Sequence, residues 1–165
     1  MFNEGCAYLA AQHILDRAMS DKIATLEVAL PMFVMSAFAS ELFLKCMHIQ
    51  AHGAFPKTHD LQRLVLGLPE DVRADIEKHW NAHYKSFTQA AKVVSVRNNK
   101  DLILDFNKAI ASQKDTFVRL RYTFSGKSIS STSDDTPMLD KLPYLLRNVL
   151  IQRNPEWLRG FRRAK

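Results

Sequence analysis

Apolar residues recur at helical spacing along most of the chain, and β-branched residues form no alternating run of the kind that predicts a strand. In residues 3–19 this spacing places Tyr8, Ala11, Leu15 and Ala18 on one side of an amphipathic helix. Glycine and proline are too few to break the pattern often. We therefore predict an all-α fold, a bundle of about five or six helices.

The segment 27–51 predicts a long helix with Pro31 in its first turn. It is apolar almost all round as far as Ser40, which is typical of a central, buried helix. Its most apolar run has 13 residues, 28–40, and is too short to cross a bilayer. We therefore predict a buried helix and no contact with a membrane.

Capping residues and proline mark the helices that follow. Thr58 or Asp60 can cap a short helix that ends at Leu66, and Pro69 begins a helix that extends toward Ala91. The segment 101–124 predicts one further long helix, starting at its first residue. Its apolar stripe comprises Ile103, Phe106, Ile110, Phe117, Leu120 and Phe124.

Residues 125–136 are rich in Ser, Thr and Asp and predict a flexible surface loop. The last helix is predicted to start near Pro143, with five residues facing inward: Leu142, Leu145, Leu146, Val149 and Leu150. We interpret 1–124 as a helical bundle, and 137–165 as a C-terminal helix and basic tail of the same domain.

Basic charge is concentrated at the C-terminal end. The net charge is +6, and residues 147–165 hold six basic residues against Glu156 alone, which gives +5. A tail with Arg159, Arg162 and Arg163 suits phosphate backbones, and Trp157 in its first turn can stack on bases. The alternative is a solubilising terminal helix that folds its apolar side onto the bundle.

Cysteine and histidine patterns give little support for a redox or metal site. Two cysteines without a C-x-x-C spacing, and a start without a basic apolar leader, favour a reducing cytoplasm. The pairs His48/His52 and His79/His83 have metal-binding spacing, but no flanking Glu or Cys completes a ligand set. We predict exposed helix histidines, no metal and no cofactor.

Arg121 does not fit the apolar face on which it falls. In the 101–124 helix it lies inside the apolar stripe, whereas Arg119 faces the opposite way. A buried guanidinium requires a carboxylate or a cleft, and Glu41, spaced i, i+4 from Lys45 on the central helix, can supply the carboxylate. Two hypotheses stay open: an ion cluster that fixes helix register, or a polar pocket lined also by Tyr122, His59 and Asp60.

Three segments in order, "SAFASELFLKCMHIQAHG", "THDLQRLVLGLP" and "FVRLRYTFSG", resemble the HEPN family of helical domains associated with RNA and nucleotides. The resemblance covers roughly residues 30–125. It implies a domain of prokaryotic defence or toxin–antitoxin systems that forms a homodimer and meets an antitoxin or another protein partner. It implies that Arg121 binds phosphate, that Glu41 orients it, and that Tyr122 supplies a hydroxyl or a stacking face.

The ribonucleases of that family carry an Arg followed four to six residues later by a His. Neither Arg119 nor Arg121 is followed by such a His, so the resemblance implies binding without the usual cleavage. Two alternatives remain. The chain is a metal-independent endoribonuclease with a non-standard site, for which His59 is the candidate proton carrier, or it is a non-catalytic protein–protein interaction module.

Overall fold

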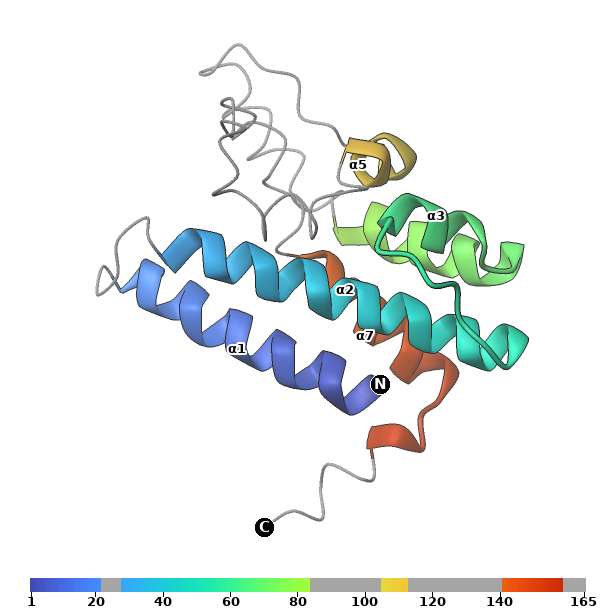
Figure 1. Cartoon of the computed structure of the whole chain (residues 1–165), viewed down its shortest axis with the longest axis horizontal. Helices are drawn as coiled ribbons and strands as arrows, with labels where there is room; N and C mark the ends of the chain where they lie inside the picture. Colours follow the sequence, from blue (N-terminus) through green and yellow to red (C-terminus); the bar gives the residue numbers. More distant parts are fainter. Residues whose placement is uncertain (22–27, 84–104, 113–140, 159–165) are drawn as a thin grey trace.

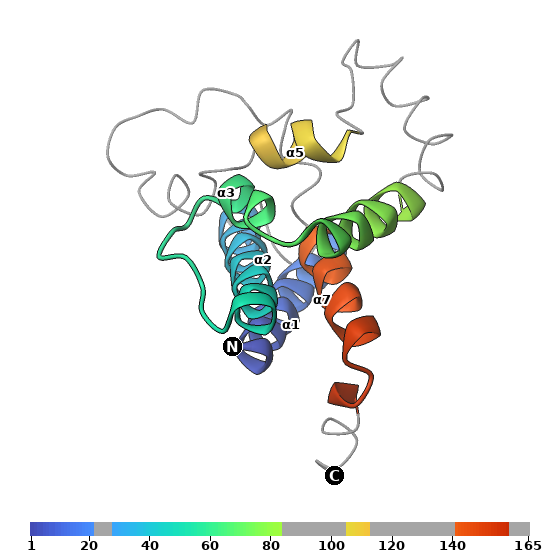
Figure 2. The same cartoon turned by 90° about the vertical axis from the view of Figure 1, so that its right-hand side faces the viewer.

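The computed structural model describes residues 1–21, 28–83, 105–112 and 141–158. Within these ranges the regular structure is helical and no strand occurs, which confirms the all-α prediction (Figure 1). Helix α1 (Phe2–Ser20) runs antiparallel to α2 (Ala29–His52), and the two pack along most of their length (Figures 1 and 2). Helix α7 (Leu142–Arg153) packs against α2 as well.

Helix α2 is the centre of the bundle. Twelve of its residues are buried, and its last turn closes at Gly53, whose left-handed φ of 75° lets its N–H cap the helix at the carbonyl of Ile49. By length and composition α2 could also span a membrane, contrary to the estimate from its 13 most apolar residues. However, 61% of its apolar window is buried inside the bundle, as in the core helix of a soluble protein.

Helix α1 approaches α2 closely at Gly5. The buried residues of α1 are Gly5, Leu9 and Gln12. The residues predicted to face inward, among them Tyr8 and Leu15, are only half-buried. They lie beside the buried face of α1 rather than at its centre. A Cβ at position 5 would lie 2.6 Å from Cε1 of Phe43, a fully buried side chain, so the glycine is what lets this ring pack against α1.

The short helices lie on the other side of α2. Helix α3 (Leu61–Leu66) begins at Asp60, whose carboxylate accepts a hydrogen bond from the N–H of Arg63, which confirms one of the two predicted caps. Residues 70–83 form a helix whose first backbone bond runs from Arg73 to the carbonyl of Pro69. Figure 2 shows α3 above α2 and the 70–83 helix above the start of α7.

Helix α5 (Phe106–Ser112) corrects the prediction of one helix starting at residue 101. Asp105 is non-helical and acts as an N-cap, because its side chain accepts from the N–H of Lys108 at 2.8 Å. Phe106 and Ile110 of the predicted stripe are buried, and the Phe106 ring lies 5.4 Å from that of Trp80. The apolar pattern was correct here, but it did not mark the helix start.

Helix α7 confirms its prediction: Pro143 lies in its first turn and the five residues expected to face inward are all buried. Just beyond it, Trp157 packs on Phe2 with 4.6 Å between ring centroids. That contact supports the docking of the terminal segment onto the bundle, at least as far as Trp157. The basic residues Arg159, Arg162 and Arg163 lie outside the described residues.

Polar contacts tie the end of α7 to its neighbours. The Arg153 guanidinium donates to Asp71 at 2.5 Å and to Asp75 at 2.6 Å, both on the 70–83 helix. Hydrogen bonding from Arg153 holds the pKa of the Asp71 carboxyl below its usual range. These exposed groups fix the angle between helices more than they add stability, because surface ion pairs contribute little.

Replacing Gly5 tests how tightly α1 and α2 interlock. We expect Gly5→Ala to lower the free energy of unfolding by about 1–3 kcal/mol, because the new methyl overlaps the Phe43 ring. In a Phe43→Leu background the same substitution should cost little, since the smaller side chain leaves room for the methyl. Urea denaturation of the four proteins measures this coupling, and an equal loss in both backgrounds would contradict it.

Candidate functional site

The candidate site is built around the carboxylate of Glu41, which is 1% exposed in the middle of α2. One of its oxygens, Oε1, accepts a hydrogen bond from Lys45 Nζ at 2.7 Å, one helical turn later. Both side chains are buried, and a buried charge without a partner is costly, so each of the two charges stabilises the other. The i, i+4 pair predicted from the sequence is therefore present.

His59 is the second partner of the same carboxylate. Its Nδ1 lies 3.0 Å from each oxygen of Glu41 and must donate, because an ionised carboxylate only accepts. In the neutral ring Nε2 then carries the lone pair. The imidazole side chain is 52% exposed, so it connects the buried Glu41 to the surface.

The backbone around His59 is fixed by two local contacts. The N–H of Asp60 donates to the hydroxyl of Thr58 at 3.1 Å, and the Asp60 side chain caps α3. The sequence placed Asp60 in the pocket lining. The structure instead uses its carboxylate as a helix cap, so Asp60 positions its neighbour His59 rather than facing Glu41.

An aromatic side chain completes the cluster. Lys45 Nζ lies 5.3 Å from the centroid of the Phe55 ring, a cation–π distance. Phe55 is 41% exposed, so part of its ring is open to solvent. We call Glu41, Lys45, Phe55 and His59 the Glu41 cluster. Sequence reasoning missed Phe55; the available signal was a large aromatic residue in the polar "HGAFPKTHD" loop, which begins at the helix cap Gly53.

The histidines next to this cluster have a structural role. His48, expected to be exposed, is buried, and its Nε2 donates to the carbonyl of Leu64 at 2.8 Å. His52 is exposed as predicted, and its Nε2 donates to the carbonyl of Gly67 at 3.1 Å. These bonds attach α2 to the end of α3, and a carbonyl-bound nitrogen is not a metal ligand. Within the described ranges no group of three metal-ligating side chains occurs.

His79 and His83, the other predicted pair, are both partly buried in the 70–83 helix. The Nε2 of His79 donates to Gln152 of α7 at 2.7 Å, a further contact between helices. Cys46, a potential nucleophile on α2, is buried, and burial raises the pKa of its thiol. It therefore stays protonated and packs as an apolar side chain.

Three predicted site residues, Arg119, Arg121 and Tyr122, lie outside the described residues. Whether Glu41 also meets Arg121 therefore stays a prediction. Among the described residues, Glu41, Lys45 and His59 are brought together as expected, and Asp60 is adjacent. Comparisons with protein-family models, with curated proteins and with solved structures gave no match.

The arrangement has two chemical capacities. A His59 ring that carries both protons can donate from Nε2 to an anion such as a phosphate while Nδ1 stays bonded to Glu41, and Phe55 offers an exposed ring face for stacking. In addition, a carboxylate that fixes one nitrogen of an imidazole orients the other for proton transfer. The cluster is therefore suited to contact a phosphate, a base, or both.

The Glu41 cluster is stable because the buried charges of Glu41 and Lys45 are paired with each other. Glu41→Ala is expected to lower the free energy of unfolding by about 3–5 kcal/mol, because it leaves the Lys45 ammonium without its partner. The double variant Glu41→Leu with Lys45→Met should recover much of that loss, since it buries no charge. Chemical denaturation, followed by the helical circular-dichroism signal, gives both values.

The matched control is Glu77→Ala, which removes an exposed carboxylate from the 70–83 helix. That change should stay within about 0.5 kcal/mol of the wild type. If Glu41→Ala cost no more than Glu77→Ala, Glu41 and Lys45 would not be a buried pair in solution.

Proposed function

We propose that this chain is a HEPN-like helical domain that binds RNA or a nucleotide through the Glu41 cluster. The observation that carries the proposal is that a carboxylate 1% exposed holds both a lysine and a half-exposed histidine, with an exposed aromatic ring beside them. The cluster joins two of the three segments on which the family resemblance rests, the Glu41–Lys45 helix and the turn at His59.

The placement of charge favours a phosphate-containing ligand. Glu41 is buried, whereas the His59 side chain and the ammonium group of the loop residue Lys57 are exposed, so both lie nearer to a ligand than the carboxylate does. Phe55 adds a surface on which a base can stack whatever its sequence. An ammonium, an imidazole and an aromatic ring within one short loop and one helical turn are what a single nucleotide requires.

The wider setting follows from the resemblance alone. It comprises a cytoplasmic protein of prokaryotic defence or a toxin–antitoxin pair, a symmetric homodimer, and an antitoxin as partner. In this proposal Arg121, with Arg119 and Tyr122, adds phosphate contacts to those of the Glu41 cluster, and the tail arginines Arg159, Arg162 and Arg163 add non-specific attraction.

A second candidate function, a metal-independent endoribonuclease, is favoured by the bond between Nδ1 of His59 and Glu41. In that reaction Nε2 takes the proton of a ribose 2′-hydroxyl, and the 2′-oxygen attacks the adjacent phosphorus. The bond from phosphorus to the 5′-oxygen breaks, and this oxygen takes the proton now held by Nε2 of His59 and leaves as a 5′-hydroxyl. The products are one RNA fragment that ends in a 2′,3′-cyclic phosphate and a second fragment that begins with a 5′-hydroxyl.

Binding is tested with a fluorescently labelled single-stranded RNA, by anisotropy at one fixed salt concentration. Phe55→Ala should weaken binding about tenfold through loss of stacking, and His59→Ala should weaken it as well. Arg121→Ala tests the sequence-based phosphate contact in the same assay, with the helical signal checked for retained folding.

His13→Ala is the matched control, because His13 is an exposed histidine on α1, a helix that contributes no residue to the Glu41 cluster. It should bind as the wild type does. Failure of the wild type to bind RNA or nucleotides would remove the proposal and leave the protein–protein interaction module.

Cleavage is tested by incubating the wild type, His59→Ala and His13→Ala with end-labelled RNA in the presence of a chelator. The nuclease hypothesis expects products ending in a 2′,3′-cyclic phosphate from the wild type and from His13→Ala, and none from His59→Ala. Intact RNA in every sample would leave binding as the function of the cluster.

A further inference from the structure

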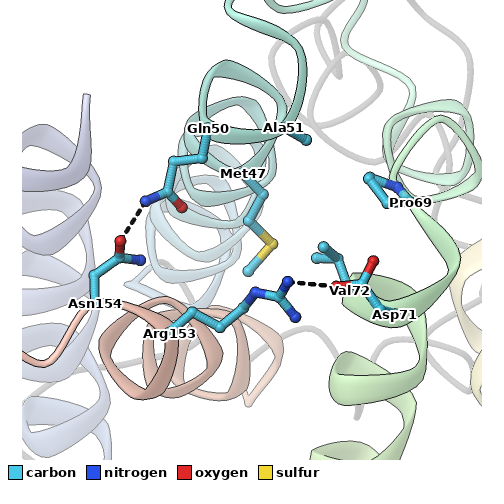
Figure 3. Close-up of a pocket in the computed structure, with 8 residues that line it drawn as sticks. All are labelled: Met47, Gln50, Ala51, Pro69, Asp71, Val72, Arg153 and Asn154. Atoms are coloured by element: carbon cyan, nitrogen blue, oxygen red, sulfur yellow. Dashed lines mark hydrogen bonds and ion pairs between the residues drawn. The ribbon is translucent and has the colours of Figure 1, made fainter.

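A pocket of about 290 Å³ lies on a different side of α2 from the Glu41 cluster (Figure 3). At 100° per residue Gln50, on its rim, is on the opposite face of the helix from Glu41. The pocket is closed by Pro69 and Val72 at the start of the 70–83 helix and by Arg153 and Asn154 at the end of α7. Its volume is near the lower limit for small-molecule sites.

A chain of hydrogen bonds fixes which way the amide of Gln50 faces. Asn154 Nδ2 donates to the carbonyl of Leu150 at 2.8 Å, and a carbonyl cannot donate, so Asn154 must present Oδ1 to Gln50. Gln50 Nε2 donates to that oxygen at 2.6 Å. Figure 3 shows the amide nitrogen of Gln50 facing Asn154, which leaves the amide oxygen as an acceptor beside one remaining N–H on the rim of the pocket.

The rest of the lining favours an uncharged ligand that has apolar surface. Met47 and Val72 are buried apolar side chains whose surfaces form part of the wall, together with the ring of Pro69. The two charged residues of the lining, Asp71 and Arg153, are bonded to each other, and Arg153 is bonded to Asp75 as well, so the lining carries no net charge and its guanidinium is already paired. That balance disfavours an anion, and a phosphate group would have to stay outside.

We propose that this pocket binds a single amino-substituted purine base, of which adenine is the natural example. The apolar walls take the ring faces, and the Gln50 oxygen accepts from the exocyclic amino group. The remaining Gln50 N–H donates to a ring nitrogen, the pairing that makes glutamine and asparagine amides selective for adenine. Nothing in this inference uses the Glu41 cluster, so it stands or falls apart from the proposed function.

The probe is adenosine, which carries no phosphate and so does not report on phosphate contacts at the Glu41 cluster. Saturation-transfer NMR on the intact chain should show transfer to the purine protons, and titration should give the dissociation constant. Purine riboside, which lacks only the amino group, should bind about tenfold more weakly. Gln50→Ala should weaken adenosine binding by a similar factor and remove the difference between the two nucleosides.

Ala51→Leu fills the pocket from an exposed helix position and should abolish adenosine binding without unfolding the chain. Its matched control is Ala74→Leu, an exposed alanine of the 70–83 helix that does not line the pocket, which should bind adenosine as the wild type does. Phe55→Ala, which removes the stacking ring of the Glu41 cluster, should also leave adenosine binding intact. The inference is overturned if the wild type gives no saturation transfer, if Ala51→Leu binds normally, or if only Phe55→Ala loses binding.

Discussion

Helix α2 is apolar almost all round over its first half, and the rest of the bundle buries it most completely from Ser36 to His48. Helix α1 packs along one side, α7 and the short α3 along others, and Gly5 is small so that Phe43 can meet α1 directly. Burial of such a helix supplies much of the free energy of folding, because apolar area removed from water is the dominant favourable contribution. Because α2 is buried, every polar group that it carries in its buried part needs a hydrogen-bond or ion-pair partner.

The polar groups of α2 meet that condition in distinct ways. Glu41 and Lys45 neutralise each other within one turn, His48 and His52 donate to carbonyls at the end of α3, and Ser40 donates to the carbonyl of Ser36. The Glu41–Lys45 pair reaches the surface through the imidazole of His59. For the proposed ligand such a pair would be a preorganised contact, since the protein rather than the ligand has already ordered it.

Helical periodicity was sufficient to predict the long helices and the burial of α7, because each residue there is placed by its own neighbours along the chain. The spacing of Glu41 and Lys45 predicted their pairing for the same reason. Helical periodicity failed at Asp105, because the apolar pattern continues through this residue although it is a helix cap. It also failed at His48, whose hydrogen-bond acceptor lies on α3, 16 residues away in the chain. The pocket combines α2, the turn at Pro69 and α7, so no local pattern contains it.

The short helix α3 affects how firmly His59 is held in the Glu41 cluster. Its cap, Asp60, is bonded along the chain to His59, so the same few residues that start α3 also hold the imidazole against the carboxylate. A helix of six residues has little cooperativity of its own and opens locally more readily than the long helices. Each such opening frees the ring, so the lifetime of the assembled histidine–carboxylate contact is set by the fraying of α3, and the exchange rate of the Arg63 amide proton reports it.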